Sequence, residues 1–326
     1  MTNLPDFRYV RPTSVDDAVK ALAAPGALPI AGATDLLPNL RRGLKQPEAL
    51  VDLTAIGGLA MLEETAEGWL IGAGLPLAAL ADHPSLSRHL PVLAEAARAV
   101  AGPTHRAAGT VGGNLCQDTR CIFYNQSEWW RSGNGYCLKY QGDRCHVAPK
   151  TSRCFATYRG DLAPALLVLG AEAELASAGG RRNLPLAQLF QDDGAAHLTL
   201  APGEILVAVK VPRNDRLVAG YAKLRVRDSI DFPLVGVAAA LERDGDRLVR
   251  LRLAITGTNS APLAVSTEGL EGEAWDEKTA KALADRLNKT AKLQNTTTIG
   301  MKYRRRVLLA AARRLIDGLW EQGKAP

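Results

Sequence analysis

Apolar residues between positions 15 and 22 recur with the three- and four-residue steps of an amphipathic helix. Ser14, followed three residues later by Asp17, is typical of a capping box at the start of such a helix. Further along, short apolar runs indicate a strand, a helix ended by Gly43 and a second strand. We expect these elements at residues 28–30, 36–42 and 50–53. Their order is an α/β pattern.

The segment 75–100 is rich in Ala and Leu at helical spacing. Pro84 and Pro91 interrupt it, which predicts two helices. A Gly-rich stretch follows at residues 109–114, and apolar α/β character returns at residues 161–169.

The pattern changes beyond Pro212 and predicts a separate α+β lobe. Two strands are expected at residues 234–242 and 247–255, joined by a turn at Asp244-Gly245. The second strand alternates, with Val249, Leu251, Leu253 and Ile255 on one face and Arg250 and Arg252 on the other. Two helices, at residues 276–293 and 299–320, close the chain. The last helix has an apolar stripe at four-residue steps, formed by Val307, Ala311, Leu315 and Leu319.

Residues 117–158 differ in composition from the rest of the chain. They hold two of the five tryptophans, four of the seven tyrosines and four of the five cysteines. Because regular apolar patterning lies on both sides, we interpret this segment as an insertion of about forty residues into an otherwise regular domain.

The chain has 326 residues, of which 47% are apolar and 23% charged, as in ordinary globular proteins of two or three lobes. The net charge of +6 suits an anionic cofactor, an acidic protein or nucleic acid equally. The basic run 304–306 lacks interleaved aromatic residues, so we interpret it as a solvated or interface face and expect no nucleic-acid partner.

The sequence predicts a cytoplasmic protein. Residues 1–28 lack the pattern of a secretory signal, and no apolar run approaches the roughly 18 residues that cross a bilayer. We therefore expect no membrane association. In a reducing compartment, clustered cysteines are metal ligands or redox groups more often than disulfides.

Two loops of small residues, 31–35 and 110–114, can bring backbone N–H groups close to an anion. Neither loop is followed by the Gly-Lys-Ser/Thr of a Walker loop, and neither has the spacing of the Rossmann fingerprint. Taken alone, each loop is more simply a tight turn without a ligand.

Four cysteines of the insertion form a second candidate site. The intervals between Cys121, Cys137, Cys145 and Cys154 contain 15, 7 and 8 residues. Zinc sites usually present close C-x2–4-C pairs, and the common ferredoxin patterns differ as well. Spacing alone therefore leaves an iron–sulfur cluster, a zinc site and four unrelated buried thiols open.

Taken together, the loops A-G-A-T-D-L (31–36) and G-T-V-G-G-N-L (109–115) resemble those of one family. This is the flavoprotein subunit or domain of the molybdenum hydroxylases, which includes xanthine dehydrogenase and the medium subunit of carbon monoxide dehydrogenase. The resemblance continues in the family's order through F-R-Y-V-R-P-T-S-V-D-D-A at the start, Asp161-Leu162-Ala163-Pro164, Gly203-Glu204-Ile205-Leu206, Lys223-x-Arg225 and Tyr303-Arg304-Arg305.

The resemblance implies an α+β fold. A two-lobed FAD-binding domain is expected over residues 1–215, with an iron–sulfur insertion at 117–158, followed by a C-terminal flavoprotein domain of antiparallel strands and helices over 216–326. Both loops are implied to wrap the FAD pyrophosphate, the first with Ala31, Gly32, Ala33, Thr34, Asp35 and Leu36, the second with Thr110, Val111, Gly112, Gly113 and Asn114.

Four further positions are implied to contact the flavin. Val100 lies against the cofactor, Asp161 bonds the ribityl or ribose region, and Leu206 and Lys223 line the isoalloxazine site. Ala33 departs from the family, which more often has Gly there, and its methyl group requires a φ below zero.

The insertion resembles one branch of the family, the β subunit of 4-hydroxybenzoyl-CoA reductase. This implies a [4Fe–4S] cluster bound by Cys121, Cys137, Cys145 and Cys154, with Cys116 a packed bystander. Four aromatic residues are expected to shield the cluster or to form the insertion's own small core: Tyr124, Trp129, Trp130 and Tyr136.

The implied function is electron transfer within a molybdenum enzyme of aromatic degradation. Electrons pass from a ferredoxin-like donor through the cluster and FAD toward [2Fe–2S] clusters on a small subunit and molybdopterin on a large one. The complex is expected to be a heterohexamer of three subunit types that converts 4-hydroxybenzoyl-CoA to benzoyl-CoA. No catalytic side chain is assigned here, and His105 and His146 are interpreted as structural.

Two alternatives remain open. In the first, the chain is the FAD subunit of an oxidative molybdenum hydroxylase whose cysteines are structural or bind zinc. The other is a non-catalytic flavin- or metal-binding sensor that has lost its partner subunits.

Overall fold

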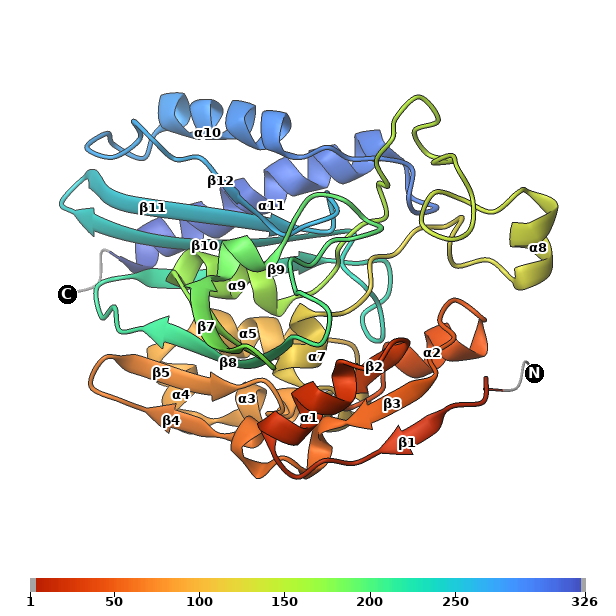
Figure 1. The fold of residues 1–326 in the computed structure, drawn as a ribbon. Helices are drawn as coiled ribbons and strands as arrows, with labels where there is room; N and C mark the ends of the chain where they lie inside the picture. Colours follow the sequence, from red (N-terminus) through yellow and green to blue (C-terminus); the bar gives the residue numbers. More distant parts are fainter. Residues whose placement is uncertain (1–3, 324–326) are drawn as a thin grey trace.

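The computed structural model describes residues 4–323, in which three sheets form the framework. Figure 1 shows the N-terminal elements at one side of the molecule and the C-terminal lobe at the other. No helix within the described residues is long and apolar enough to cross a membrane.

The N-terminal sheet is parallel, with strand order β1-β3-β2. Its strands are β1 (Arg8–Val10), β2 (Ala27–Ile30) and β3 (Ala49–Asp52), connected by α1 (Val15–Leu22) and α2 (Leu36–Arg41). The Ser14 hydroxyl caps α1 by accepting from the Asp17 N–H at 3.1 Å, which confirms the predicted start of that helix.

An antiparallel sheet of order β4-β5-β8-β6-β7 forms the middle of the molecule. Its strands are β4 (Leu62–Glu64), β5 (Gly68–Gly72), β6 (Glu172–Ser177), β7 (Gly180–Pro185) and β8 (Ile205–Pro212). The largest apolar core lies between this sheet and the helices around α9 (Leu162–Leu169). Short 3-10 helices are found in the described chain at Leu53–Ala55, Gly57–Ala60 and Leu186–Leu189.

The segment predicted to hold two helices holds three: α3 (Leu77–Asp82), α4 (Pro84–His89) and α5 (Pro91–Ala99). Both prolines stand at the first position of a helix, where the missing N–H has no partner to lose and the fixed φ suits the helix. Each proline therefore starts a helix as well as ending the previous one. The helices α6 (Pro103–Ala108) and α7 (Val111–Leu115) follow.

The C-terminal lobe is an antiparallel sheet of order β12-β11-β10-β9 packed against two helices. The strands are β9 (Val218–Leu224), β10 (Val235–Asp244), β11 (Arg247–Thr256) and β12 (Leu263–Val265), and the helices are α10 (Glu277–Thr290) and α11 (Met301–Gln322). This lobe, together with the two sheets before it, confirms the predicted mixed α and β fold.

Two details of this lobe differ from the sequence prediction. Val249 is 43% exposed because a bulge pairs Glu242 with Arg250 and Arg243 with Leu248, so Leu248 takes the buried position. The predicted stripe of α11 is shifted by about one position, so that the fully buried residues include Leu308, Ala312 and Ile316 besides Ala311 and Leu319.

Residues 117–158 project from the framework and contain one helix within the described residues, α8 (Glu128–Gly133) (Figure 1). The two ends of the segment lie side by side, because Arg120 and Thr157 exchange backbone hydrogen bonds of 2.8 and 2.7 Å. A separate small apolar cluster joins Tyr124, Cys121 and Cys154 of this segment to Leu44, which lies between α2 and β3.

Candidate cofactor site

A cavity of about 570 Å³ lies between the loop that joins β2 to α2, the region of α6 and α7, and the segment 197–206. Its volume is within the range of about 300–1,000 Å³ that is typical of ligand and cofactor sites. Twelve of the fifteen predicted flavin-site residues line it: Ala31, Gly32, Ala33, Thr34, Asp35, Leu36, Val100, Thr110, Gly112, Gly113, Asn114 and Leu206.

The first loop offers unsatisfied backbone donors to this cavity. The N–H groups of Gly32, Ala33 and Thr34 donate to no residue of the described chain. Buried or half-buried backbone N–H groups need an acceptor, and successive free N–H groups in a turn form an anion-binding concavity. This loop can therefore hold an anionic group such as a diphosphate.

Gly32 brings the two predicted loops into backbone contact. A Cβ atom at this position would lie 1.9 Å from the Ala108 carbonyl oxygen and 2.8 Å from the Gly109 Cα atom. Because these obstacles are backbone atoms, a side chain cannot be accommodated by a rotamer change. Gly32 is therefore required for the first loop to close against the segment that carries the second loop.

Ala33 adopts a left-handed conformation, with φ of 59°. The expectation that its φ stays below zero is wrong. An L-residue with a Cβ atom loses roughly 1–2 kcal/mol in this region because the Cβ atom crowds the backbone. The loop thus keeps the shape that suits glycine and places a strained alanine in it.

The second loop also lines the cavity, but the N–H groups of its glycines already have acceptors. The Gly112 N–H donates to the Ala73 carbonyl at 2.7 Å, and the Gly113 N–H donates to the Thr110 hydroxyl at 3.0 Å. The N–H groups of these two glycines are therefore used within the protein, whereas those of Gly32, Ala33 and Thr34 in the first loop are available to an anion.

Three predicted flavin contacts lie outside the cavity lining. Val111 is 1% exposed and packs into the main core. Asp161 and Lys223 form an ion pair of 2.9 Å with both side chains 4% exposed, and the ammonium also donates to the Ala99 carbonyl at 2.8 Å. Burial raises the pKa of Asp161, while the Lys223 charge acts against this rise. The pair is thus bonded to the backbone beside Val100, and neither of its side chains lines the cavity.

The sequence reading missed several residues of the lining. His105, which we had interpreted as structural, also faces the cavity, and its Nδ1 atom is buried without a hydrogen-bond partner in the described chain. The segment 197–200 follows an irregular loop and carries no motif, so the sequence held no signal for it. The missed residues include Lys45, Ala101, Gln117, Asp118, His197, Leu198, Leu200 and Phe232.

Two of these missed residues have displaced pKa values. Burial, with the Lys139 charge second, lowers the pKa of His197 to about 4, and its Nε2 lies 2.9 Å from the Gln117 carbonyl oxygen. Burial raises the pKa of Asp118, but the charges of Lys139 and Lys45 and the hydrogen bond from Lys139 outweigh it and bring the pKa to about 2. At neutral pH His197 is therefore neutral and Asp118 ionised.

The four cysteines of the insertion, Cys121, Cys137, Cys145 and Cys154, line one small cavity. Burial raises the pKa of Cys121, and it raises that of Cys154 to about 12. Within the described residues, no group of three or more His, Cys, Asp or Glu side chains is arranged closely enough to hold a metal ion. The donor set itself, four thiols converging from one segment, fits an iron–sulfur cluster or zinc.

The aromatic residues of the insertion divide into two groups. Tyr124 is 2% exposed and lines the cysteine cavity together with Phe123, whose ring stacks on His146 at a centroid distance of 5.2 Å. Trp129 is 83% exposed, so the expectation that it shields the cysteines is wrong. Trp129 lies near the start of the short helix α8, which Ser127 caps, and its side chain faces solvent.

Cys116 belongs to the other cavity. It is half-buried, lines the candidate cofactor site rather than the cysteine cavity, and burial raises its pKa to about 12. This agrees with its interpretation as a thiol outside the cysteine cluster.

Comparison with known proteins identifies two family models in the chain. The FAD binding domain in molybdopterin dehydrogenase matches residues 5–214, and the CO dehydrogenase flavoprotein C-terminal domain matches residues 220–319.

Curated relatives and solved structures agree with these models. The aldehyde oxidoreductase FAD-binding subunit PaoB of Escherichia coli is 36% identical over 256 residues, which span 75% of this chain and 80% of that protein. The carbon monoxide dehydrogenase medium chain of Afipia carboxidovorans is 29% identical over 321 residues, 94% of this chain and 97% of its own length. A crystal structure of Cu,Mo-CO dehydrogenase aligns with a TM-score of 0.77 at 25% identity, covering 97% of this chain and 98% of that one.

Proposed function

The chain belongs to the FAD-binding subunits of the molybdenum hydroxylase family, and from this membership we propose that it transfers electrons using both FAD and a [4Fe–4S] cluster. The observation that carries the proposal is the presence of two cavities, one walled by the flavin loops and one lined by four cysteines. FAD exchanges one or two electrons and the cluster exchanges one, while the protein positions both and adjusts their potentials.

In the proposed flavin site, the first loop binds the diphosphate. The free N–H groups of Gly32, Ala33 and Thr34 supply the donors, and Gly32 allows the two loops to close. Apolar side chains such as Val100 and Leu206 exclude water from the rest of the cavity. The buried pair of Asp161 and Lys223 acts as a support of this wall.

In the proposed cluster site, Cys121, Cys137, Cys145 and Cys154 supply four thiolates. Three of them are buried, and Tyr124 and Phe123 line the same cavity, so the site is sheltered from water. Shelter from solvent and the charges nearby are the properties that set the potential of an iron–sulfur cluster.

The proposed complex contains a large molybdopterin-binding subunit and a small [2Fe–2S] subunit, in a heterohexamer of three subunit types. Two relatives are named as carbon monoxide dehydrogenase medium chains, which supports an assembly of several different chains. We propose the reductive reaction of 4-hydroxybenzoyl-CoA reductase, in which a ferredoxin-like protein supplies two electrons. Two protons are also taken up, and benzoyl-CoA and water are formed on the large subunit.

One observation favours a second candidate. The relatives are named as an aldehyde oxidoreductase subunit and carbon monoxide dehydrogenase chains. In this candidate the chain serves an oxidative hydroxylase, electrons flow away from molybdenum, and the cysteines are structural or bind zinc.

Metal analysis of the anaerobically purified complex tests the cluster. We expect about four irons and four acid-labile sulfides per chain beyond those of the small subunit, with an additional EPR signal on reduction. Zinc in this chain without iron would overturn the cluster and favour the second candidate.

The direction of the reaction needs a separate assay. Under anaerobic conditions the reduced complex is expected to form benzoyl-CoA from 4-hydroxybenzoyl-CoA. Oxidation of aldehydes with no dehydroxylation would overturn the reductase assignment while leaving the FAD and cluster assignments unaffected.

A further inference from the structure

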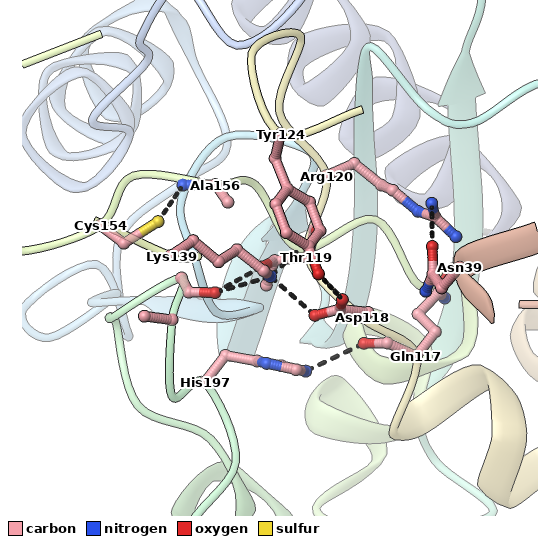
Figure 2. A network of polar contacts seen from close by, with 12 residues as sticks. Asn39, Gln117, Asp118, Thr119, Arg120, Tyr124, Lys139, Cys154, Ala156 and His197 are labelled. Atoms are coloured by element: carbon pink, nitrogen blue, oxygen red, sulfur yellow. Dashed lines mark hydrogen bonds and ion pairs between the residues drawn. The ribbon is translucent and has the colours of Figure 1, made fainter. Parts of the chain in front are cut away.

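The segment 117–119 helps to line the flavin cavity and also contacts Lys139, which lines the cysteine cavity. Asp118 lines the flavin cavity, and Lys139 lines the cysteine cavity. The Lys139 ammonium and the Asp118 carboxylate are joined by an ion pair of 2.6 Å, drawn as a dashed line in Figure 2. A largely buried pair of opposite charges therefore connects the walls of the two cavities.

The ammonium of Lys139 is held in place from several sides. It donates to the Gly194 carbonyl at 2.9 Å and to the carbonyl and hydroxyl oxygens of Thr119, and it lies 4.7 Å from the centroid of the Tyr124 ring. Its side chain is 3% exposed. Because solvent does not screen it, its charge acts on its surroundings more strongly than a surface lysine would.

The carboxylate of Asp118 is also fixed. It accepts from the Tyr124 hydroxyl at 3.2 Å. The backbone N–H of Asp118 donates to the carboxylate of Asp35, in the first flavin loop, at 3.0 Å. Arg120 in turn holds the other oxygen of the Asp35 carboxylate (Figure 2 shows the neighbouring bond from Arg120 to Asn39). The network thus runs from the cysteine cavity to the loop that carries the free N–H donors.

We propose that Lys139 is a positioning residue that raises the reduction potential of the group bound by the four cysteines, and that Asp118 moderates this effect from the flavin side. The inference rests on the proposed cluster. Reduction adds negative charge to the site, so a fixed cation on its wall stabilises the reduced state, and a fixed anion behind the cation weakens that effect.

The test is an EPR-monitored redox titration of the intact complex carrying Lys139→Met, with Lys150→Met as the matched control. Lys150 lies in the same segment and loses the same charge, but its side chain is exposed. We expect Lys139→Met to disfavour reduction at least tenfold, a shift of about 59 mV toward lower potential for a one-electron couple. Lys150→Met is expected to leave the potential unchanged.

Two further variants separate charge from structure. Lys139→Arg keeps the cation and should restore most of the wild-type potential. Asp118→Asn removes the anion and should shift the potential in the opposite direction, toward higher values. Equal potentials in wild type, Lys139→Met and Asp118→Asn, with iron retained, would overturn the inference.

Metal and flavin contents, measured on the same samples, keep the outcomes distinct. Loss of iron from Lys139→Met alone, with iron retained in Lys139→Arg, supports the need for a cation at this wall. Loss of iron from both variants, with FAD retained, overturns the potential-setting role and leaves only a structural one. Absence of iron from the wild-type chain overturns the proposed cluster itself.

Discussion

At the scale of single residues, Ala33 combines a functional position with backbone strain. It contributes one of the free N–H groups of the flavin cavity while its φ is 59°. Strain of this kind persists where the surrounding structure determines the conformation. Here two neighbours determine the conformation of the loop. Gly32 packs closely against the Ala108 carbonyl, and α2 begins directly after the loop.

Ala33→Gly is expected to increase the free energy of unfolding by about 0.5–1 kcal/mol. Relief of the left-handed strain outweighs the extra freedom that glycine has in the unfolded chain. Chemical denaturation followed by circular dichroism measures the change. Ala31→Gly is the matched control, because Ala31 has no positive φ, and it should instead destabilise. Destabilisation by Ala33→Gly comparable to that of the control would contradict the strain.

His197 is expected to make the protein sensitive to acid. In the unfolded chain the imidazole has the ordinary pKa of 6.5, whereas burial lowers its pKa in the folded chain to about 4. The unfolded state therefore binds more protons between these values, and the free energy of unfolding falls as the pH decreases from 6.5 to 4, by about 3 kcal/mol at most.

Denaturation curves of His197→Gln across this pH range test that contribution. The glutamine amide can still donate to the Gln117 carbonyl, so the variant should fold and lose less stability on acidification than the wild type. Wild-type and variant curves that fall in parallel would show that His197 is not the group responsible.

Residue chemistry was partly predictable from the sequence. Small residues at 31–36 and 110–114 allow a close approach of backbone, but only the family resemblance implied that both loops line one cavity, as they do. Arg304 was interpreted as part of a solvated or interface face, yet it is fully buried and donates to the carbonyls of Leu234, Gly257 and Gln294. A basic run does not reveal which of its members meets buried carbonyl groups in the tertiary fold.

At the scale of elements, the short helix α7 depends on its N-cap. The Thr110 hydroxyl accepts from the Gly113 N–H at 3.0 Å, and Thr110 is 6% exposed. This bond fixes the glycine-rich second loop, in which two glycines otherwise favour disorder.

Thr110→Ala is therefore expected to destabilise the protein by about 1 kcal/mol and to speed flavin dissociation, because the wall of the cavity loosens. Thermal unfolding and the rate of flavin release into dilute buffer measure the two effects. Thr110→Ser, which keeps the hydroxyl, should resemble the wild type. Equal loss in both variants would place the effect in the methyl group rather than in the cap.

Element types followed from periodicity, while their details followed from local chemistry. The stripe over residues 15–22 and its Ser14 cap were sufficient to place α1. The number of helices between residues 75 and 100 was wrong because the sequence reading treated Pro84 and Pro91 only as breaks. The exposure of Val249 depends on a bulge, and alternation along one strand does not reveal the register of its partner.

At the scale of the whole molecule, contacts between distant segments build both cavities. Strand β8 pairs with β5, which lies more than a hundred residues earlier, and the segment 197–206 before and within it closes the flavin cavity. Neither the pairing of β8 nor residues such as His197 could be predicted from local patterns. The convergence of four cysteines on one cavity likewise depends on how the insertion folds, since their spacing alone left several chemistries open.

The separation of the two cavities leads to a prediction about the complete protein. Cys137 lines the cysteine cavity, whereas Cys116 lines the flavin cavity. Cys137→Ser should abolish the EPR signal of the proposed iron–sulfur cluster and leave about one FAD per chain, because a hydroxyl replaces one of the four proposed thiolate ligands without touching the flavin wall. Cys116→Ser, the same atomic change at the other cavity, should keep the iron. Loss of flavin from Cys137→Ser with iron retained, or loss of iron from Cys116→Ser, would show that the thiols serve the opposite sites.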